Sequence, residues 1–234
     1  MHRPSWLTVS CVTALAAFSL QAADEKTATD VRERLTNANT VFGEIMGTPD
    51  KGIPQDLLAK AECAIIIPGM KKGAFIVGAK YGKGFITCRS GNARGWSAPG
   101  NVRVEGGSIG PQIGGGEVDV FLLVMNKAGV SRILKSEFKI GGEASVMAGP
   151  VGRSSSAETD AYMRAQMLGW SRARGAFAGL ALEGSTLRED RDDNRALYGK
   201  DMTNEQIVLG NTRVPPAAQS LLNSLSKASM VASR

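Results

Sequence analysis

The sequence predicts an α+β protein, with one β-rich domain built on a mostly antiparallel multi-stranded sheet or barrel and helices at both ends. The first observation is that 28 of the 234 residues are glycine, which favours tight β architecture over a helix bundle. The second is that glycines and β-branched residues are interleaved over residues 106–153, a pattern typical of closely packed strands and bulges. The third is the helical periodicity of apolar residues in the flanking segments.

Residues 1–23 have the features of a secretory signal peptide. Arg3 supplies a positive charge, residues 6–20 are apolar, and Gln21-Ala22-Ala23 offers small residues for cleavage. The apolar segment is too short for a stable membrane-spanning anchor. We therefore expect a secreted protein that is periplasmic or associated with the envelope. Lipoprotein anchoring through Cys11 fits less well, because this cysteine lies inside the apolar segment rather than after it.

Residues 24–60 form a predicted N-terminal helical segment. A helix is expected over residues 27–46, because apolar side chains recur there at three- and four-residue steps: Val31, Leu35, Ala38, Phe42 and Ile45. This helix could lie on a membrane surface or pack on the core. We favour packing, because its polar face is not basic. A second short helix is expected over residues 54–60, with Pro54 in its first turn.

Residues 61–210 form the predicted β-rich domain. Its first strand covers residues 63–67 and ends at Pro68-Gly69, and the next two are joined by a turn at Gly82-Lys83. Residues 162–172 are predicted to pair with residues 177–182 across Arg174-Gly175. The remaining predicted strands are 74–81, 84–89, 102–105, 108–113, 118–125, 138–140 and 144–151.

Short helices complete the prediction. One is expected near residues 130–135, and a solvated one over residues 189–198. Thr203 and Gln206 form a capping box for another short helix. Residues 211–234 are a C-terminal helical tail that opens at Pro215-Pro216. A polar loop is expected over residues 154–159.

Two cysteines, Cys63 and Cys88, follow the signal segment. In an oxidising compartment cysteines on neighbouring strands can form a disulfide. The alternative is a pair of buried free thiols, which behave as small apolar side chains. Both readings stay open, because the sequence does not determine the Cα separation on which a disulfide depends.

The residues that support catalysis are scarce. Ser108 lies in a G-x-S-x-G pattern, but His2, in the signal segment, is the sole histidine, so this serine has no histidine base. Pro111 and further glycines follow instead of a helix. We therefore predict no enzymatic activity and no cofactor. Two cysteines without a mature histidine also fail to match the usual structural zinc sites.

Several blocks of residues occur in order within residues 61–210: Gly95-Trp96-Ser97-Ala98-Pro99, Gly106-Gly107-Ser108-Ile109-Gly110, Ala148-Gly149-Pro150-Val151-Gly152-Arg153 and Leu182-Glu183-Gly184. With these blocks the segment resembles the SYLF domain, a lipid-binding family found from bacteria to animals. The resemblance implies a peripheral membrane protein that binds anionic phospholipid or phosphoinositide headgroups, and no nucleic acid. Some yeast members are linked to actin, which we do not expect of a secreted chain. The alternative function is an envelope structural or adaptor protein that binds protein partners.

The net charge is +6, and the basic excess falls between residues 63 and 184, which is compatible with an anionic partner or with a solvated surface. The candidate lipid site begins at an expected exposed turn over residues 68–73. There Met70 would enter the lipid interface while Lys71 and Lys72 contact phosphate oxygens. Because two lysines bind weakly, further cations at strand ends complete the predicted site: Lys80, Lys83, Arg172 and Arg174. The alternative is an ordinary solvated turn.

Overall fold

The computed structural model describes residues 9–47, 52–74, 77–90, 95–109, 114–135, 137–141, 146–149, 165–173, 176–178, 182 and 184–230. Its strands are β1 (Cys63–Ala74), β2 (Val77–Cys88), β3 (Gly100–Ile109), β4 (Gly114–Val124), β5 (Glu137–Lys139), β6 (Val146–Ala148), β7 (Met167–Ala173), β8 (Ala176–Ala178) and β9 (Ser185–Glu189). Its helices are α1 (Val9–Met46), α2 (Gln55–Lys60), α3 (Lys127–Ile133), α5 (Arg191–Tyr198), α6 (Asn204–Val208), the 3₁₀ turn η1 (Pro216–Ala218) and α7 (Gln219–Ser229).

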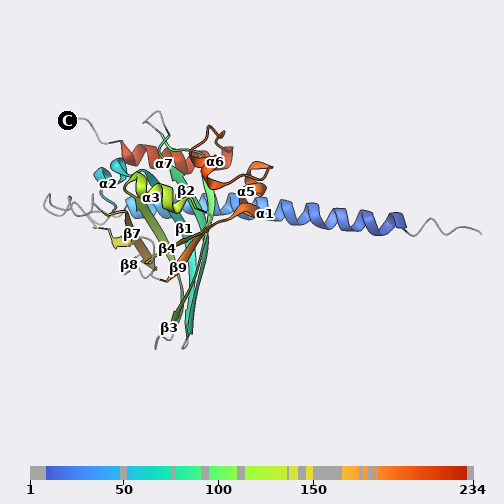
Figure 1. The fold of residues 1–234 in the computed structure, drawn as a ribbon, viewed down its shortest axis with the longest axis horizontal. Helices are drawn as coiled ribbons and strands as arrows, with labels where there is room; N and C mark the ends of the chain where they lie inside the picture. Colours follow the sequence, from blue (N-terminus) through green and yellow to red (C-terminus); the bar gives the residue numbers. More distant parts are fainter. Residues whose placement is uncertain are drawn as a thin grey trace, which may run out of the picture.

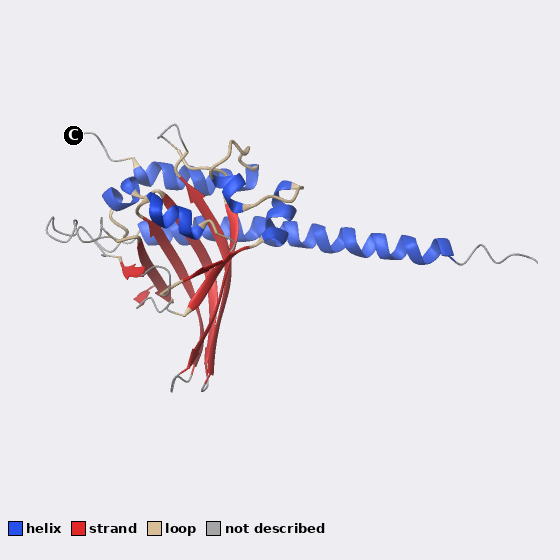
Figure 2. Cartoon of the chain, in the orientation of Figure 1, coloured by secondary structure: helices blue, strands red, loops and turns tan. Residues whose placement is uncertain are grey.

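The strands form one curled sheet, and helices from both ends of the chain pack against it (Figures 1 and 2). The strand order is β5-β9-β3-β2-β1-β4-β7-β6, and β8 pairs with β7. The β6–β7 pair is parallel and the other pairs are antiparallel. The predicted α+β class, with a mostly antiparallel sheet and flanking N- and C-terminal helices, is confirmed.

The two faces of β1–β4 carry two separate apolar clusters. The helix face, marked by Ile66, Phe85 and Phe121, packs against α1, α2 and α7. The inner face, marked by Ile65 and Ile86, packs against residues of α3, β5, α6 and β9. When a strand is buried on both faces, all of its residues tend to be apolar. This explains the continuous apolar sequence of residues 63–67.

Helix α1 covers the helix face with the predicted apolar stripe. Val31, Leu35 and Phe42 are buried, and so are the other two residues of the stripe. The choice of core packing over a membrane-surface role is therefore confirmed for this stripe. The predicted helix start at residue 27 was wrong, because the helix begins at Val9 and its N-terminal part extends away from the body (Figure 1). The apolar residues before the stripe include no proline or glycine that would stop the helix.

Strand β1 continues through the predicted stop at Pro68-Gly69. The register with β4 shifts between Ile67 and Met70, so that Pro68 and Gly69 together lie opposite Asp119. This is a β-bulge, in which one extra residue is accommodated without ending the strand. Gly69 takes the left-handed φ of 58°, and its amide donates to Asp119 Oδ1 at 2.9 Å. The predicted exposed turn over residues 68–73 was therefore wrong.

Other predicted breaks were also wrong, for the same reason. Gly82-Lys83 lies inside β2, which is a single strand, and the predicted strands at 102–105 and 108–113 correspond to the one strand β3. From the sequence alone, these glycines predict turns. In the structure they lie inside continuous strands, where they allow the backbone to pack closely. The pairing of β7 with β8 and the capping box at Thr203 are confirmed. Strand β9 was not predicted. Residues 110–113, 142–145 and 150–164, and the Arg174-Gly175 turn, lie outside the described residues.

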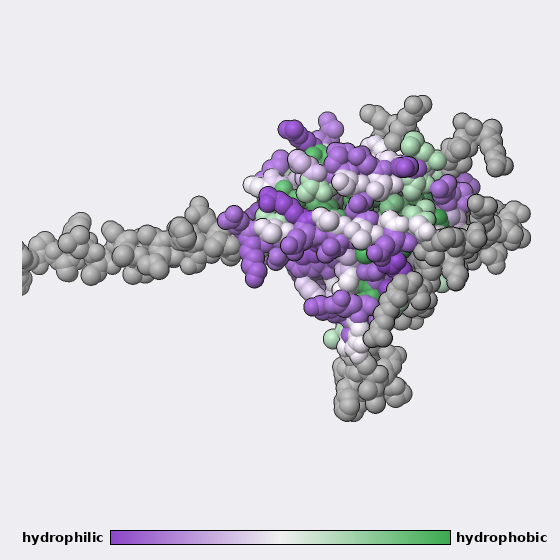
Figure 3. Space-filling model, turned by 180° about the vertical axis from the view of Figure 1, so that it is seen from behind, coloured by the Kyte–Doolittle hydropathy of each residue, from purple (hydrophilic) through white to green (hydrophobic). Residues whose placement is uncertain are grey.

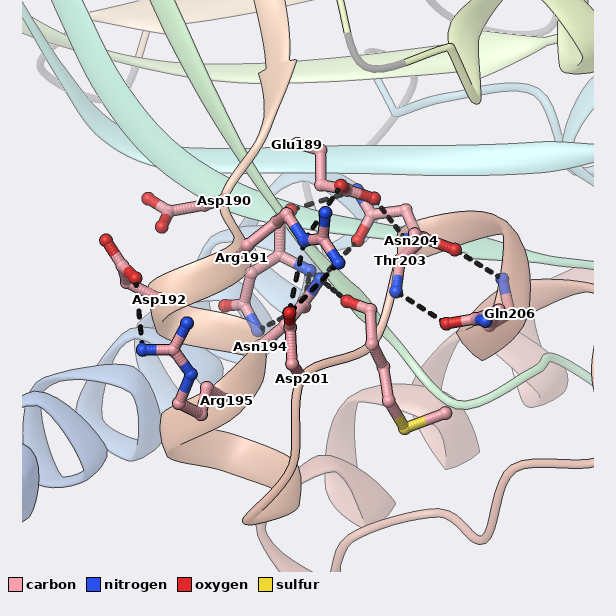
Figure 4. A network of polar contacts seen from close by, with 12 residues as sticks. Glu189, Asp190, Arg191, Asp192, Asn194, Arg195, Asp201, Thr203, Asn204 and Gln206 are labelled. Atoms are coloured by element: carbon pink, nitrogen blue, oxygen red, sulfur yellow. Dashed lines mark hydrogen bonds and ion pairs between the residues drawn. The ribbon is translucent and has the colours of Figure 1, made fainter.

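Helices α5 and α6 are held to β3 by a network of buried amide side chains. The Asn101 amide and side-chain nitrogen both donate to Asn194 Oδ1, and Asn194 Nδ2 donates to Asn204 Oδ1 at 2.9 Å. Asn204 Nδ2 donates in turn to the Asn101 carbonyl, which closes the network on β3. Figure 4 shows Asn194 and Asn204 together with the capping residues Thr203 and Gln206. Helix α5 was predicted to be solvated, but its residues Asp193 and Asn194 are buried.

Cys63 and Cys88 form a disulfide between β1 and β2. The two residues are direct cross-strand partners in the antiparallel pair. Of the two alternatives left open by the sequence, the structure contains the disulfide.

The bulge requires a glycine opposite it, which leads to a first prediction. A Cβ on residue 84 would lie 2.0 Å from the carbonyl oxygen of Ile66, so Gly84→Ala forces the backbone of β1 to move. We expect this substitution to lower the free energy of unfolding by about 3 kcal/mol in denaturant titrations. Gly73→Ala is the matched control, because its new methyl group would meet no atom within 4 Å. Equal stability of the two variants would contradict this account of the bulge.

Candidate functional site

Two lysines lie directly opposite each other on the inner face, where the outer ends of β1–β4 extend beyond the helices (Figure 1). Lys72 of β1 is the cross-strand partner of Lys80 of β2. On the far side of each lysine the partner is a glycine, Gly116 for Lys72 and Gly106 for Lys80. Cross-strand partners project from the same face. The lysine pair therefore lies between two positions without side chains. The surface is open at Gly116, where a Cβ would meet no atom within 4 Å, and covered at Gly106, where a Cβ would lie 2.6 Å from Ser185 Oγ.

The electrostatics of this pair favour an anion. Partial burial and the nearby charge of Lys80 both lower the pKa of Lys72 below its usual value. Like charges placed directly opposite each other destabilise a sheet. Among the described residues, Lys72 has no ion pair that would offset this repulsion. A phosphate or carboxylate group between the two ammonium groups would offset it.

Met70 lies in the next row of the inner face, beside Val118 of β4. It was predicted to be exposed, and this was wrong: its exposure is 0%. The bulge directs its side chain inward, over Gly82, where a Cβ on residue 82 would lie 2.8 Å from Met70 Cγ. Met70 therefore belongs to the apolar cluster that borders the lysine pair, and it is not available for insertion into lipid.

Lys71 projects from the opposite face of the sheet. Its cross-strand partners are Tyr81 of β2 and Glu117 of β4, and all three side chains are exposed. Because successive side chains of a strand alternate between faces, adjacent lysines of one strand cannot contact the same headgroup. Lys71 and Lys72, which were predicted to contact lipid together, therefore lie on opposite faces of the sheet.

Lys83 holds helices to the sheet. Its Nζ lies 2.8 Å from Asp190 Oδ2 and 2.9 Å from Asp193 Oδ1, and Arg34 of α1 lies 2.6 Å from the other oxygen of Asp193. Burial alone would lower the pKa of Lys83, but hydrogen bonds and charge from Asp190 and Asp193 outweigh it and raise the pKa above its usual 10.5. This lysine is therefore engaged in a partly buried ion-pair network between β2, α5 and α1.

Arg172 has a similar structural role on β7. It forms an ion pair with Glu44 of α1 and lies 3.7 Å from Asp119 Oδ2, the carboxylate that also accepts from Gly69. Arg174 lies outside the described residues. Of the predicted lipid-binding residues, the structure therefore brings together Lys72 and Lys80, with Met70 in the next row of the same face. It does not bring Lys71, Lys83 or Arg172 into this group.

The glycines beside the lysines were not predicted as part of the site. Their contribution depends on strand pairing, which sequence reasoning did not resolve. The available signal was the period of two in Gly78-Ala79-Lys80-Tyr81-Gly82, which places the glycines and the lysine on one face. Ser108 pairs with Gly78 inside β3, rather than standing on a strand-to-helix turn. In the described part of the chain, no cluster of three metal-binding side chains is found.

The motif at residues 95–99 has a structural role. The guanidinium of Arg89 lies 4.1 Å from the centre of the Trp96 ring and donates to the carbonyls of Leu58 and Ala59 at the end of α2. Ser97 Oγ accepts from the Cys88 amide at 3.0 Å. This motif therefore joins α2 to the end of β2 and does not form part of the lysine site.

The surface opposite to the view of Figure 1 is mainly hydrophilic, with small hydrophobic areas between polar residues (Figure 3). No helix within the described ranges has both the length and the apolar character needed to cross a membrane.

Comparison with known proteins gives a family and several relatives. A family model named Ysc84 and described as "Las17-binding protein actin regulator" matches residues 105–228. Protein YSC84 of Saccharomyces cerevisiae is 35% identical over 207 residues, which is 86% of this chain and 42% of the yeast protein. LAS seventeen-binding protein 3 of the same species is 34% identical over 86% of this chain and 43% of its own length. The human SH3 domain-containing YSC84-like protein 1 is 33% identical over 74% of this chain and 50% of its own length. The chain thus spans about two fifths to one half of these relatives.

The ion-pair network predicts a pH-dependent loss of stability. Because the pKa of Lys83 is raised on folding, its contribution is fully present below pH 10.5 and is lost as the pH rises through the raised value. Lys83→Met should lower the free energy of unfolding by about 2 kcal/mol at neutral pH, since two buried carboxylates lose a donor. The difference from the wild type should shrink in urea titrations above pH 10.5. The control is Lys200→Met, which removes an exposed lysine. An equal loss of unfolding free energy in this control would refute the role of Lys83.

The lysine pair predicts an unusual gain in stability. Lys72→Glu converts the repulsion with Lys80 into attraction, so the free energy of unfolding should rise by about 0.5 kcal/mol. Lys71→Glu makes the same charge change on the other face, but opposite Glu117, and should lower stability by a similar amount. Thermal and urea denaturation measures the change in the free energy of unfolding for each variant. The same sign in both variants would contradict the assignment of the two lysines to different faces.

Proposed function

The chain belongs to the Ysc84 family, which confirms the SYLF resemblance seen in the sequence, and on this premise we propose that it is a non-enzymatic module that binds anionic lipid headgroups. The observation that supports this proposal is the opposed pair Lys72 and Lys80 on a glycine-flanked part of the inner face that is open on the Gly116 side. A phosphate group between the two lysines would offset their mutual repulsion.

The binding should be weak and sensitive to salt. A lysine near an anionic membrane surface contributes about 1 kcal/mol, so two lysines together give roughly a thirtyfold effect. Two further predicted members of the site, Lys83 and Arg172, are used within the fold. Added salt screens exposed charges, so affinity should fall as ionic strength rises. We further propose that the chain acts at an envelope membrane after export, on the basis of the signal features of residues 1–23.

A second candidate function is the binding of a protein partner. The matching family model is described as a Las17-binding actin regulator, and one yeast relative is named as a LAS seventeen-binding protein. A chain of this family could therefore act as an adaptor. Co-sedimentation with actin filaments, without any affinity for anionic vesicles, would favour this function over lipid binding.

The test of the lipid proposal is vesicle co-sedimentation. Lys72→Glu combined with Lys80→Glu should reduce binding to phosphatidylcholine vesicles that contain an anionic phospholipid by at least tenfold. Lys200→Glu combined with Lys227→Glu is the control, because it makes the same change in net charge at two exposed lysines outside the pair. Circular dichroism establishes that both variants are folded. Wild-type binding by the folded Lys72/Lys80 variant would overturn the proposed site, and an equal loss in the control would reduce it to an effect of net charge.

A further inference from the structure

A cleft of about 670 Å³ lies between the C-terminal end of α5 and the segment that joins α6 to η1. Leu197, Tyr198 and Lys200 line one side, and residues 211–216 line the other. Helices α5 and α6 lie in the upper part of Figure 1, whereas the outer strand ends that carry the lysine pair lie at the bottom. The cleft is therefore separate from the candidate lipid site.

The joining segment, residues 211–214, has the side-chain alternation of a β-strand. Thr212 and Val214 are half-buried, and Val214 packs against both apolar clusters. Asn211 and Arg213, which alternate with them, are exposed. Alternation between a buried and an exposed side is typical of a strand. The segment is therefore extended along the wall of the cleft, although it belongs to no sheet.

The backbone of this segment has unused hydrogen-bonding groups. Within the described part of the chain, neither the amide nor the carbonyl of Arg213 or Val214 forms a backbone–backbone hydrogen bond. Pro215 continues the extended conformation, with φ of −64° and ψ of 143°. In an antiparallel pair one residue exchanges both of its backbone hydrogen bonds with the residue opposite. An extended segment with such free groups can pair with a strand from another chain.

The charged side chains of the cleft have one sign. Among the described residues that line it, the charged ones are Lys200 and Arg213, and both are exposed. Neither forms an ion pair with another described residue. The carboxylate of Asp201, next to Lys200 in the chain, pairs instead with Arg191 at 3.1 Å (Figure 4). The two cations therefore favour carboxylate groups in a ligand.

The wall that α5 contributes is largely apolar. The side chains of Leu197 and Tyr198 are half-buried and line the cleft. The Tyr198 hydroxyl donates to the Pro99 carbonyl at 2.6 Å, which holds the ring in a fixed position. An aliphatic side chain of a ligand would bury apolar surface against this wall.

We propose that this cleft binds an extended acidic segment of a partner protein, which pairs with residues 211–214 as an added strand. In this mode of recognition backbone hydrogen bonds supply affinity and alternate side chains supply specificity. A segment of alternating acidic and aliphatic residues would direct carboxylates toward Lys200 and Arg213 and aliphatic groups toward the α5 wall. The inference goes beyond the proposed lipid binding, since the two sites share no residue.

The experiment measures the fluorescence anisotropy of a labelled peptide, Glu-Leu-Glu-Val-Glu, with the full-length chain. Lys200→Glu combined with Arg213→Glu should weaken binding about tenfold, because two attractions become repulsions. Lys72→Glu combined with Lys80→Glu is the control, since it makes the same change in net charge outside the cleft and should keep wild-type affinity. Circular dichroism establishes that both variants are folded. If the first variant does not fold, Lys200→Gln combined with Arg213→Gln should weaken binding about threefold.

Modified peptides test the added strand. Successive amides of a strand point to opposite edges, so methylation of one alternate set of peptide nitrogens should abolish binding and methylation of the other set should be tolerated. Neither change alters the charge of the peptide. Equal binding of both methylated peptides and the unmodified one would overturn the added strand. A peptide with lysine in place of each glutamate should not bind.

The remaining outcomes bear on the site itself. Wild-type affinity in the folded Lys200/Arg213 variant would overturn the proposal, and an equal loss in the Lys72/Lys80 variant would reduce it to an effect of net charge. Displacement of the peptide by free glutamate at the same concentration would also overturn it, because the cleft would then recognise a single carboxylate. The Lys200/Arg213 variant should bind anionic vesicles as the wild type does, so failure of the lipid proposal leaves this one standing.

Discussion

The bulge at Pro68-Gly69 determines which face receives each side chain of the outer half of β1. Before the bulge Ile65 and Ile67 point to the inner face, and after it Met70 and Lys72 do so, because one extra residue reverses the alternation. If the same residues paired regularly, without the bulge, Lys71 would lie opposite Lys80, and Met70 would leave the inner cluster. The position of the candidate site therefore depends on the bulge and on Gly84, which makes room for it.

Interactions on the helix face keep the bulge in place. Asp119 accepts from the Gly69 amide and lies near Arg172, which in turn pairs with Glu44 of α1. A separate set of ion pairs joins Lys83 to Asp193 and α1. The basic excess seen in the sequence is thus divided between two uses. Part of it fastens α1 to the sheet, and part, in Lys72 and Lys80, lies on the inner face.

Much of the fold follows from local patterns in the sequence. The apolar stripe of α1, the capping box at Thr203 and the β7–β8 hairpin were predicted, because each depends on residues that are close in the chain. The candidate site was predicted only in part. Lys72 and Lys80 were named, but their grouping with Lys71 assumed a turn where the chain forms a bulge. Gly106 and Gly116 flank the lysine pair through pairing between distant strands, which single-sequence periodicity does not specify.

The Cys63–Cys88 disulfide makes the β1–β2 hairpin a closed covalent ring. The two cysteines are 25 residues apart and join the strands at the end opposite to their chain connection. A ring of this size restricts the unfolded chain by an amount worth about 3 kcal/mol in the entropic description of disulfides. It also excludes conformations in which β1 slides along β2 by one residue, because both ends of the hairpin are tied. The disulfide therefore fixes the register of β1 against β2. In a reducing environment the strands that carry the lysine pair would lose this constraint.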